Sequence, residues 1–494
     1  GSSKTITIDL ANGRPADFYG IITGTSNLTK TGATNLLLYG ANTYTGTTTI
    51  SEGKLRVYGT LSDSTDVINS GTYEVDTTDT INSLSGTGAV EIASGVTLTT
   101  GDDGEDIISG IISGDGSLTK VGSGTLTLSN NSNSYTGDTT VSEGTLTLTG
   151  NLSSSTDLII SPGATLDLQA TQTVTSLDLD GTISNSAGSS ALTVSGTSDI
   201  GGNITTSGNQ VYSGAISLTG NSILTSSSGA ITLSSTVDGG STLTTSSSGN
   251  LTTSGIIGGT TPLTSLSATA GGNISYVNNI TTTGSISLNA EGNVDPNPSS
   301  GNITLTTTNS DVTLNADSEG NGTGTFYGNL IINPGSGNVT IRGATIANEI
   351  YQVNGTGTLT IESNAASFAS NFTSNALTEA STLTGLTIGK STNTSDITLN
   401  SDISVSGAVT VYGSTIDLHS DITSSGAGDI TISASTEIND PDNTTRKDVT
   451  NSSGDIYLIA DSDGAGLLRI GYLTLDAGSD DLILRGSTFN WGTD

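Results

Sequence analysis

The most informative pattern along this chain is the alternation of apolar and polar residues in short segments. Residues 125–128 and 145–148 both read Thr-Leu-Thr-Leu. A period of two places successive side chains on opposite faces of a β-strand, so each segment predicts a half-buried strand. Clusters of Gly, Asn and Ser between them predict turns. Strands this closely spaced leave no room for crossover helices, so we predict an all-β chain with Leu126 in its core.

The same order of strands and turns occurs twice. Residues 27–59 and 117–150 share a series of positions, and Leu28 recurs as Leu118, 90 residues later. The shared positions of the first copy are Leu28, Lys30, Gly32, Leu36, Leu38, Tyr44, Thr45, Gly46, Ser51, Glu52, Gly53 and Leu55, which recur as Leu118, Lys120, Gly122, Leu126, Leu128, Tyr135, Thr136, Gly137, Ser142, Glu143, Gly144 and Leu146. A repeat of fixed period is the signature of a solenoid.

Both copies resemble the passenger-associated transport repeat of bacterial autotransporters. The resemblance rests on the steps Leu-Thr-Lys-x-Gly, Thr-Leu-x-Leu and Tyr-Thr-Gly, and it covers roughly residues 20–180. It implies an elongated, right-handed parallel β-helix (a β-solenoid) that is secreted to the cell surface. The remainder resembles, in composition, the β-helical shafts of filamentous haemagglutinin-type exoproteins and large surface adhesins.

The rest of the chain predicts β-helical turns of unequal length. A Gly-x-Ile/Val-x-Leu/Ile pattern recurs irregularly, for example from residues 229, 284 and 428. Asn residues at the turns are expected to form hydrogen-bonded ladders. Candidates to cover the open N-terminal end are Arg14, Phe18 and Tyr19. We divide the chain into an N-terminal strand and cap (1–19), a β-helix with the two repeats (20–200), an irregular shaft (201–438) and a loop with C-terminal turns (439–494).

Composition narrows the choice of partners. The chain holds 46 acidic and 12 basic residues, a formal net charge of −34, which disfavours nucleic acid and anionic membranes as partners. Cysteine is absent, so neither disulfides nor thiolate chemistry is available. No apolar run approaches the roughly 18 residues of a membrane helix, so we expect no membrane insertion in this segment. Methionine is also absent, so we expect a processed or partial translation product.

Catalysis by a polysaccharide-cleaving enzyme is the alternative that the fold class raises, because glycoside hydrolysis needs two facing carboxylates. The pair Asp480-Asp481 would point to opposite faces of a strand. The single histidine, His419, alternates with Leu418 and is predicted to lie on the surface. The remaining candidates are scattered, namely Arg342, Arg469, Arg485 and the sole tryptophan, Trp491, beside Phe489. We therefore predict that the protein is not an enzyme.

The densest acidic segment is the candidate for a metal site. It lies between the two repeats and carries the carboxylates of Asp102, Asp103, Glu105 and Asp106. The spacing is not that of an EF-hand loop. A solvated turn is the preferred interpretation and weakly bound calcium is the alternative, and no other cofactor is expected.

Two irregular segments are the candidates for partner binding. The first runs from Asp295 to Ser300 and contains two prolines, which are excluded from central strands, so we predict either a loop projecting from the body or a junction, with Asp295 and Asn297 as candidate contact residues. The second runs from Asn439 to Lys447. Its candidate contact residues are Asn439, Asp440, Asp442, Arg446 and Lys447. Loops break the monotony of a Thr/Ser wall and carry recognition, although tolerated insertions would look the same.

Two functions remain open from the sequence. The first is a bacterial cell-surface or secreted β-helical adhesin shaft that mediates attachment to a host cell, a surface or a biofilm. Its partners would be host or bacterial surface receptors or glycans. The alternative is a structural subunit that polymerises with copies of itself into an extracellular filament, sheath or surface layer.

Overall fold

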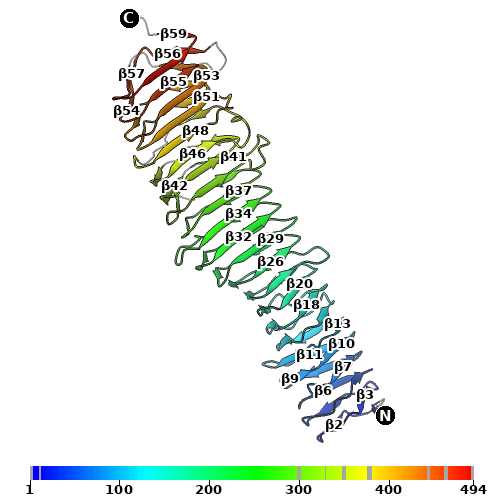
Figure 1. The fold of residues 1–494 in the computed structure, drawn as a ribbon. Helices are drawn as coiled ribbons and strands as arrows, with labels where there is room; N and C mark the ends of the chain where they lie inside the picture. The colour runs from blue at the N-terminus through cyan, green and yellow to red at the C-terminus, as the bar shows by residue number, and fades with distance from the viewer. Residues whose placement is uncertain are drawn as a thin grey trace. The chain divides into compact units, whose positions relative to one another are not determined.

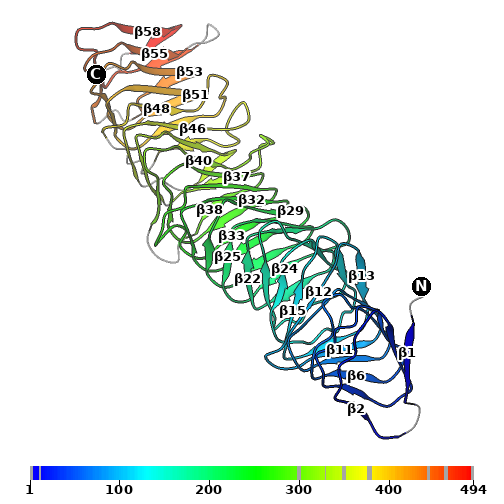
Figure 2. The same ribbon diagram turned by 60° about the horizontal axis from the view of Figure 1, so that its bottom comes forward.

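Parallel β-strands make up the regular structure of this protein. The computed structural model describes residues 4–10, 13–297, 302–328, 330–347, 352–374, 381–441, 445–460 and 466–490. Within these ranges no helix is present, and the strands pair in parallel, beginning with β1 (Thr5–Asp9) against β3 (Asn27–Thr31). The chain divides into two compact units, Gly1–Ser235 and Thr236–Asp494, and within each unit successive turns stack on one another (Figure 1 and Figure 2). The predicted all-β parallel solenoid is confirmed.

Four stacks of parallel strands build the N-terminal unit. We call the longest the long stack and name each of the others after its first strand. The long stack runs through β1, β3, β5 (Thr48–Ile50), β7 (Asp66–Asn69), β10 (Ser83–Gly86), β13 (Glu105–Ile108), β16 (Thr125–Leu128), β18 (Thr145–Leu148), β20 (Thr165–Leu168), β23 (Thr182–Ser184), β26 (Asn203–Thr206) and β29 (Ser222–Ser226). The β2 stack contains β2 (Ala16–Phe18), β4 (Leu36–Leu38), β6 (Lys54–Val57), β8 (Thr72–Val75), β11 (Ala89–Ile92) and β14 (Ile112–Gly114).

The other two stacks complete the walls of this unit. The β9 stack contains β9 (Asp79–Ile81), β12 (Thr97–Thr100), β15 (Ser117–Lys120), β17 (Thr139–Val141), β19 (Asp157–Ile160), β22 (Ser176–Leu179), β25 (Ser198–Ile200) and β28 (Ile216–Leu218). The β21 stack contains β21 (Gln172–Val174), β24 (Leu192–Val194), β27 (Gln210–Tyr212) and β30 (Ile231–Leu233).

Aliphatic side chains from successive turns form the core. In β16 the two leucines are buried and the two threonines are half-buried, as the alternation predicts. Leu126 pairs in register with Leu146 of β18, and the two side chains are 1% and 0% exposed. Full burial of one leucine contributes roughly 1.5–3 kcal/mol. The predicted core position of Leu126 is confirmed, and it belongs to a ladder in which each turn buries its neighbour.

The two repeat copies occupy different walls of this unit. In the first copy, β3 belongs to the long stack and β4 to the β2 stack. Their counterparts in the second copy, β15 and β16, belong to the β9 stack and the long stack. The repeat therefore does not correspond to a whole number of solenoid turns.

In the C-terminal unit the same construction continues with longer strands. Its main stack contains β32 (Thr242–Ser247), β34 (Ser265–Ala270), β37 (Ile286–Ala290), β40 (Val312–Asn315), β43 (Val339–Arg342), β46 (Thr358–Glu362), β48 (Gly385–Ile388), β51 (Ala408–Leu418), β53 (Ile430–Asn439), β55 (Ile456–Ala460) and β58 (Leu482–Gly486). A second stack contains β33 (Leu251–Thr253), β35 (Ile274–Tyr276), β38 (Val294–Pro296), β41 (Thr325–Tyr327) and β44 (Thr345–Ala347). Near the end, β52 (Ile422–Ser424), β54 (Lys447–Asn451) and β57 (Leu473–Asp476) pair in sequence.

Asparagine ladders join the turns of the C-terminal unit. The Oδ1 atom of Asn250 accepts the amide of Asn273 at 2.8 Å, and Oδ1 of Asn273 accepts the amide of Asn293 at 2.8 Å. Aspartates replace asparagine in later turns, where Oδ1 of Asp429 accepts the amide of Asp455 at 3.1 Å. The predicted ladders are confirmed, and they satisfy backbone donors where the chain leaves the sheet.

The first turn of the N-terminal unit leaves several side chains exposed. Arg14 is exposed, and Phe18 lies in β2 opposite the buried Leu38 while remaining 37% exposed. Tyr19, directly after β2, is 71% exposed. These residues therefore belong to the first turn of the β2 stack.

Candidate functional site

The acidic segment between the repeats is split between a turn and a strand. Asp102 and Asp103 lie in the turn, where Asp102 accepts the amide of Gly104 at 2.6 Å and Asp103 accepts the hydroxyl of Ser123 at 2.6 Å. Glu105 and Asp106 begin β13, so the prediction of one continuous turn is wrong. Their side chains diverge, because alternation along the strand leaves Glu105 exposed and turns Asp106 inward, opposite Leu126.

These four carboxylates are therefore not gathered around one point. Among the residues that the structure describes, no three His, Cys, Asp or Glu side chains are grouped to hold a metal ion. Burial, with the nearby charges of Asp102 and Asp66, raises the pKa of Asp106 to about 6. The calcium alternative for Asp102, Asp103, Glu105 and Asp106 finds no support in this arrangement.

The predicted loop at Asp295 begins with a strand instead. Residues Asp295 and Pro296 belong to β38, and Pro296 is buried opposite Tyr276 of β35. The proline is tolerated because Asn297 supplies the next ladder bond to β35, donating its amide to Tyr276 O at 2.9 Å, while β38 meets the following strand, β41, only at Val294. Asn297 itself is exposed. Residues 298–300 of the predicted loop lie outside the described residues.

Most of the second predicted loop also belongs to the sheets. Asn439 ends β53, opposite Arg469, and Asp440 is only 5% exposed and donates its amide to Arg469 O at 2.9 Å. Lys447 begins β54. The prediction that Asn439, Asp440 and Lys447 protrude is therefore wrong, because these residues continue the parallel ladders. Arg446 is exposed, as predicted, and Asp442 lies outside the described residues.

The catalytic candidates are dispersed over the C-terminal unit. His419 follows β51 with a half-buried side chain, and the adjacent Leu418 is buried on the other side, as predicted. Asp480 and Asp481 are exposed in the turn before β58, so the expectation that they lie on a strand is wrong. Arg342 and Arg469 form ion pairs with Glu362 at 2.8 Å and Glu437 at 2.7 Å. Trp491 lies outside the described residues.

A column of stacked tyrosines on the N-terminal unit was not predicted from the sequence. Tyr19, Tyr39 and Tyr58 directly follow β2, β4 and β6, which are adjacent strands of the β2 stack. Their ring centroids are 4.5 and 4.8 Å apart, with interplanar angles of 12° and 5°. The guanidinium of Arg56 lies 4.5 Å from the Tyr58 ring centroid, within the range of a cation–π contact.

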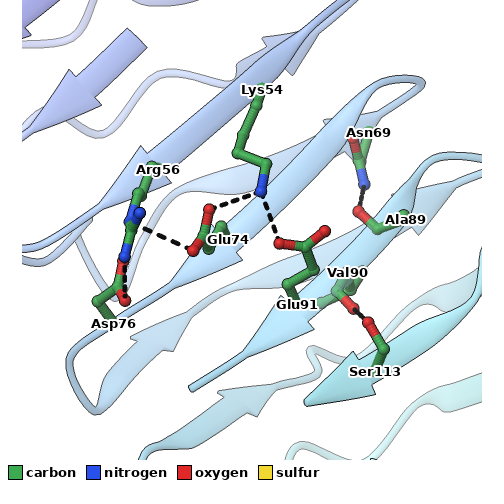
Figure 3. Close-up of polar contacts among 9 residues, drawn as sticks. All are labelled: Lys54, Arg56, Asn69, Glu74, Asp76, Ala89, Val90, Glu91 and Ser113. Atoms are coloured by element: carbon green, nitrogen blue, oxygen red, sulfur yellow. Dashed lines mark hydrogen bonds and ion pairs between the residues drawn. The ribbon is translucent and has the colours of Figure 1, made fainter. Parts of the chain in front are cut away.

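Ion pairs continue from Arg56 across the outer face of the same stack. Arg56 Nε lies 2.7 Å from Asp76 and 3.2 Å from Glu74, and Lys54 Nζ lies 2.7 Å from Glu74 and 2.6 Å from Glu91 (Figure 3). The hydrogen bond to Asp76 and the charge of Glu74 raise the pKa of Arg56, although its partial burial acts in the opposite direction. Such half-exposed pairs contribute about 0–1 kcal/mol each, so their main effect is to fix side-chain positions.

We call this surface the aromatic–charge patch, comprising Tyr19, Tyr39, Tyr58, Lys54, Arg56, Glu74, Asp76 and Glu91. One signal in the sequence could have revealed it, because Tyr39 follows Tyr19 by 20 residues and Tyr58 follows Tyr39 by 19. That spacing equals one turn of this solenoid, as the pairing of Leu36 with Leu55 shows.

Each repeat also carries a buried lysine. Lys30 and Lys120 are 0% and 1% exposed. Lys30 Nζ donates to the carbonyls of Thr31 at 2.8 Å, Gly32 at 2.5 Å and Glu52 at 3.0 Å. Burial lowers the pKa of both lysines. The arrangement joins two turns.

The second lysine repeats this set of contacts. Lys120 Nζ donates to the carbonyls of Val121 at 2.6 Å, Gly122 at 2.7 Å and Glu143 at 3.3 Å. Each lysine thus donates hydrogen bonds to backbone carbonyls of its own turn and of the turn that follows.

The chain is similar to the Adhesin BmaC autotransporter of Brucella suis biovar 1 (strain 1330), with 34% identity over 135 residues. That match covers 25% of this chain and only 4% of the length of the relative. No solved structure matches the chain. No helix long and apolar enough to cross a membrane occurs in the described part of the chain.

The family comparison falls on the two repeats. The family model of the Passenger-associated-transport-repeat matches residues 28–57 and 118–151. These segments contain Lys30 and Lys120, which we call the caged lysines because backbone carbonyls surround their ammonium groups, and the strands β4 and β16. The resemblance of the remainder to filamentous haemagglutinin-type exoproteins is not supported by these comparisons. The resemblance of the repeat region to the passengers of bacterial autotransporters, expected from the sequence, is thereby confirmed.

Proposed function

We propose that this chain is part of a passenger-type adhesin exposed on a bacterial cell surface, where it serves as a shaft that mediates attachment. The observation that carries the proposal is the presence of two passenger-associated transport repeats within a parallel β-solenoid. Its similarity to a protein named as an autotransporter adhesin supports the same function. Receptors or glycans on host or bacterial surfaces are the partners that such a function requires.

The aromatic–charge patch is our proposed contact surface. Tyrosine and arginine are the residue types enriched at binding hot spots, because they combine large apolar area with directional polar groups. Here the rings are held by stacking and Arg56 is held by its carboxylates, so little side-chain entropy would be lost on binding. Asn297 and Arg446, which are exposed, remain secondary candidates.

Display of the chain on a non-adherent bacterium tests both statements. Cells that display the chain should bind epithelial cells, or surfaces coated with glycans, more than cells that do not display it. Replacing Tyr19, Tyr39 and Arg56 together by alanine should reduce binding at least about tenfold, the loss of a 1.4 kcal/mol contact. Tyr412→Ala, on strand β51 of the C-terminal unit, is the matched control. Absence of binding by the parent chain would refute the adhesin, whereas an unaffected triple variant would refute only the patch.

End-to-end assembly is a second candidate function, favoured by one observation. Among the described residues, β1 pairs only with β3 and β2 only with β4, and the two strands carry the exposed apolar side chains Ile6, at 40%, and Phe18, at 37% exposure. Open strand edges of this kind template pairing with other chains. Electron microscopy should then show fibres that Ile6→Lys abolishes. A monodisperse monomer by light scattering at high concentration would exclude this function.

A further inference from the structure

Four corners of the N-terminal unit share one polar contact between turns. In each, a side-chain oxygen accepts the backbone amide of an aliphatic residue one turn earlier. The pairs are Asn42 with Ile22 at 3.0 Å, Asp79 with Leu61 at 2.9 Å, Asn133 with Ile112 at 2.9 Å and Gln172 with Leu152 at 2.8 Å. Asp79 is the one carboxyl among three amides.

The nitrogen atoms of these three side-chain amides also donate hydrogen bonds. Nδ2 of Asn42 donates to Thr60 O at 3.0 Å, Nδ2 of Asn133 donates to Asn151 O at 2.8 Å, and Nε2 of Gln172 donates to Gly150 O at 2.8 Å. A corner of this kind therefore suits a side chain that accepts on one atom and donates on the other. An ionised carboxylate can only accept, whereas a protonated carboxyl, like an amide, can accept on one atom and donate from the other, with one donor hydrogen where an amide has two.

The surroundings of Asp79 disfavour its charge. The residue is 3% exposed, and no lysine, arginine or histidine of the described chain forms an ion pair with it. The charged and titratable groups that face it are Asp63, Tyr44 and Tyr73, none of which is cationic. The phenol oxygen of Tyr73 is buried without a hydrogen-bond partner. The amides of Leu61 and Thr80 are the donors that oppose these effects.

We propose that Asp79 is a proton-operated latch, which holds the turns of Leu61 and Asp79 together when protonated and loosens them when ionised. Burial, reinforced by the charge of Asp63, raises the pKa of Asp79 from its ordinary value of 3.8 to about 7. The folded state therefore holds a proton that the unfolded chain has released. The resulting stabilisation is complete below about pH 4, declines as the pH rises and is lost above about pH 7.

A second inward carboxyl in the same unit titrates in the same direction. Asp106, which faces Asp66, Asp102 and Lys120, has a pKa raised to about 6 by burial. The pH dependence of a global melting temperature would combine the titrations of Asp79 and Asp106. The test therefore needs a local measurement of protection at the Leu61 amide, which donates a hydrogen bond to Asp79.

Hydrogen exchange of the whole chain, followed by mass spectrometry, provides that readout. The protection factor of a peptide containing Leu61 should fall at least about tenfold between about pH 5 and about pH 8, as linkage to this one group requires. In Asp79→Asn the protection should become independent of pH and exceed that of the parent chain at the higher pH. Asp138→Asn, which alters an exposed carboxyl, should behave as the parent does.

Two results would overturn the latch. One is an Asp79→Asn chain that keeps the pH dependence of the parent, because the proton would then bind elsewhere. The other is failure of both Asp79→Asn and Asp79→Gln to fold, because the corner would then reject the amides that Asn42 and Gln172 place in equivalent positions. A folded Asp79→Asn or Asp79→Gln chain whose Leu61 protection does not change with pH supports the proposal.

Discussion

At the scale of single residues, the caged lysines explain the Lys-x-Gly step of the repeat. An ammonium group buried in a β-solenoid needs acceptors, and the nearest are backbone carbonyls at the end of its own strand and on the following turn. The glycine two residues later, Gly32 or Gly122, adopts φ of +75° or +72°, a conformation that directs its carbonyl back toward the lysine. The motif thus encodes a cross-turn contact.

Replacing Lys120 by methionine should destabilise the N-terminal unit while keeping the side chain's apolar volume. The carbonyls of Val121, Gly122 and Glu143 would lose their common donor, which is expected to lower the free energy of unfolding by about 2–4 kcal/mol. Urea unfolding followed by circular dichroism measures the change. Lys4→Met, at an exposed position, should leave the midpoint unaltered. An equal midpoint for Lys120→Met would show that the cage contributes no net stability.

At the scale of strands, the tyrosine column follows from parallel pairing in register. Leu38 pairs with both Phe18 and Val57, so the residues that follow these positions are also superimposed. Those residues are tyrosines in three consecutive turns and Asp76 in the fourth. Each aromatic pair contributes about 0.5–1.5 kcal/mol beyond its buried area.

Removing the central ring tests the column. Tyr39→Ala eliminates both stacking contacts and should lower the free energy of unfolding by about 1–3 kcal/mol. Tyr44→Ala, which empties a fully buried position, should cost about 3–5 kcal/mol. Differential scanning calorimetry of the two variants compares them directly. A larger loss for Tyr39→Ala than for Tyr44→Ala would contradict the assignment of an outer column.

The strands were predictable wherever alternation was strong, as at Leu126 and Leu128. Prediction failed at Pro296 and Asn439, where turn-forming residues lie inside ladders. A proline has no backbone N–H, so it needs only one side of its strand to be free of a ladder bond that would require that donor. Whether such a side exists depends on the neighbouring turn rather than on local sequence. The aromatic–charge patch was missed for a related reason, because its members are adjacent in space only after the number of residues per turn is known.

At the scale of the whole molecule, excess negative charge opposes compaction. With 46 acidic and 12 basic residues, carboxylates on successive turns repel one another, as Asp178 and Asp199 do where they pair in register. Raising the ionic strength from about 0.01 M to about 0.3 M should therefore raise the melting temperature, since the Debye length falls from roughly 30 Å to below 8 Å. A lower melting temperature at high salt would show that the ion pairs outweigh this repulsion.

The offset of the two repeats between walls has a consequence for how the N-terminal unit meets a flat surface. The outer residues of β4 and of its counterpart β16 belong to different stacks, so the two copies present equivalent strands in different directions about the solenoid axis. Rotation about that axis, which withdraws one copy from the surface, brings other members of the repeat toward it. Contact made through repeated positions would thus depend less on the rotational setting of the unit than contact made through a single wall.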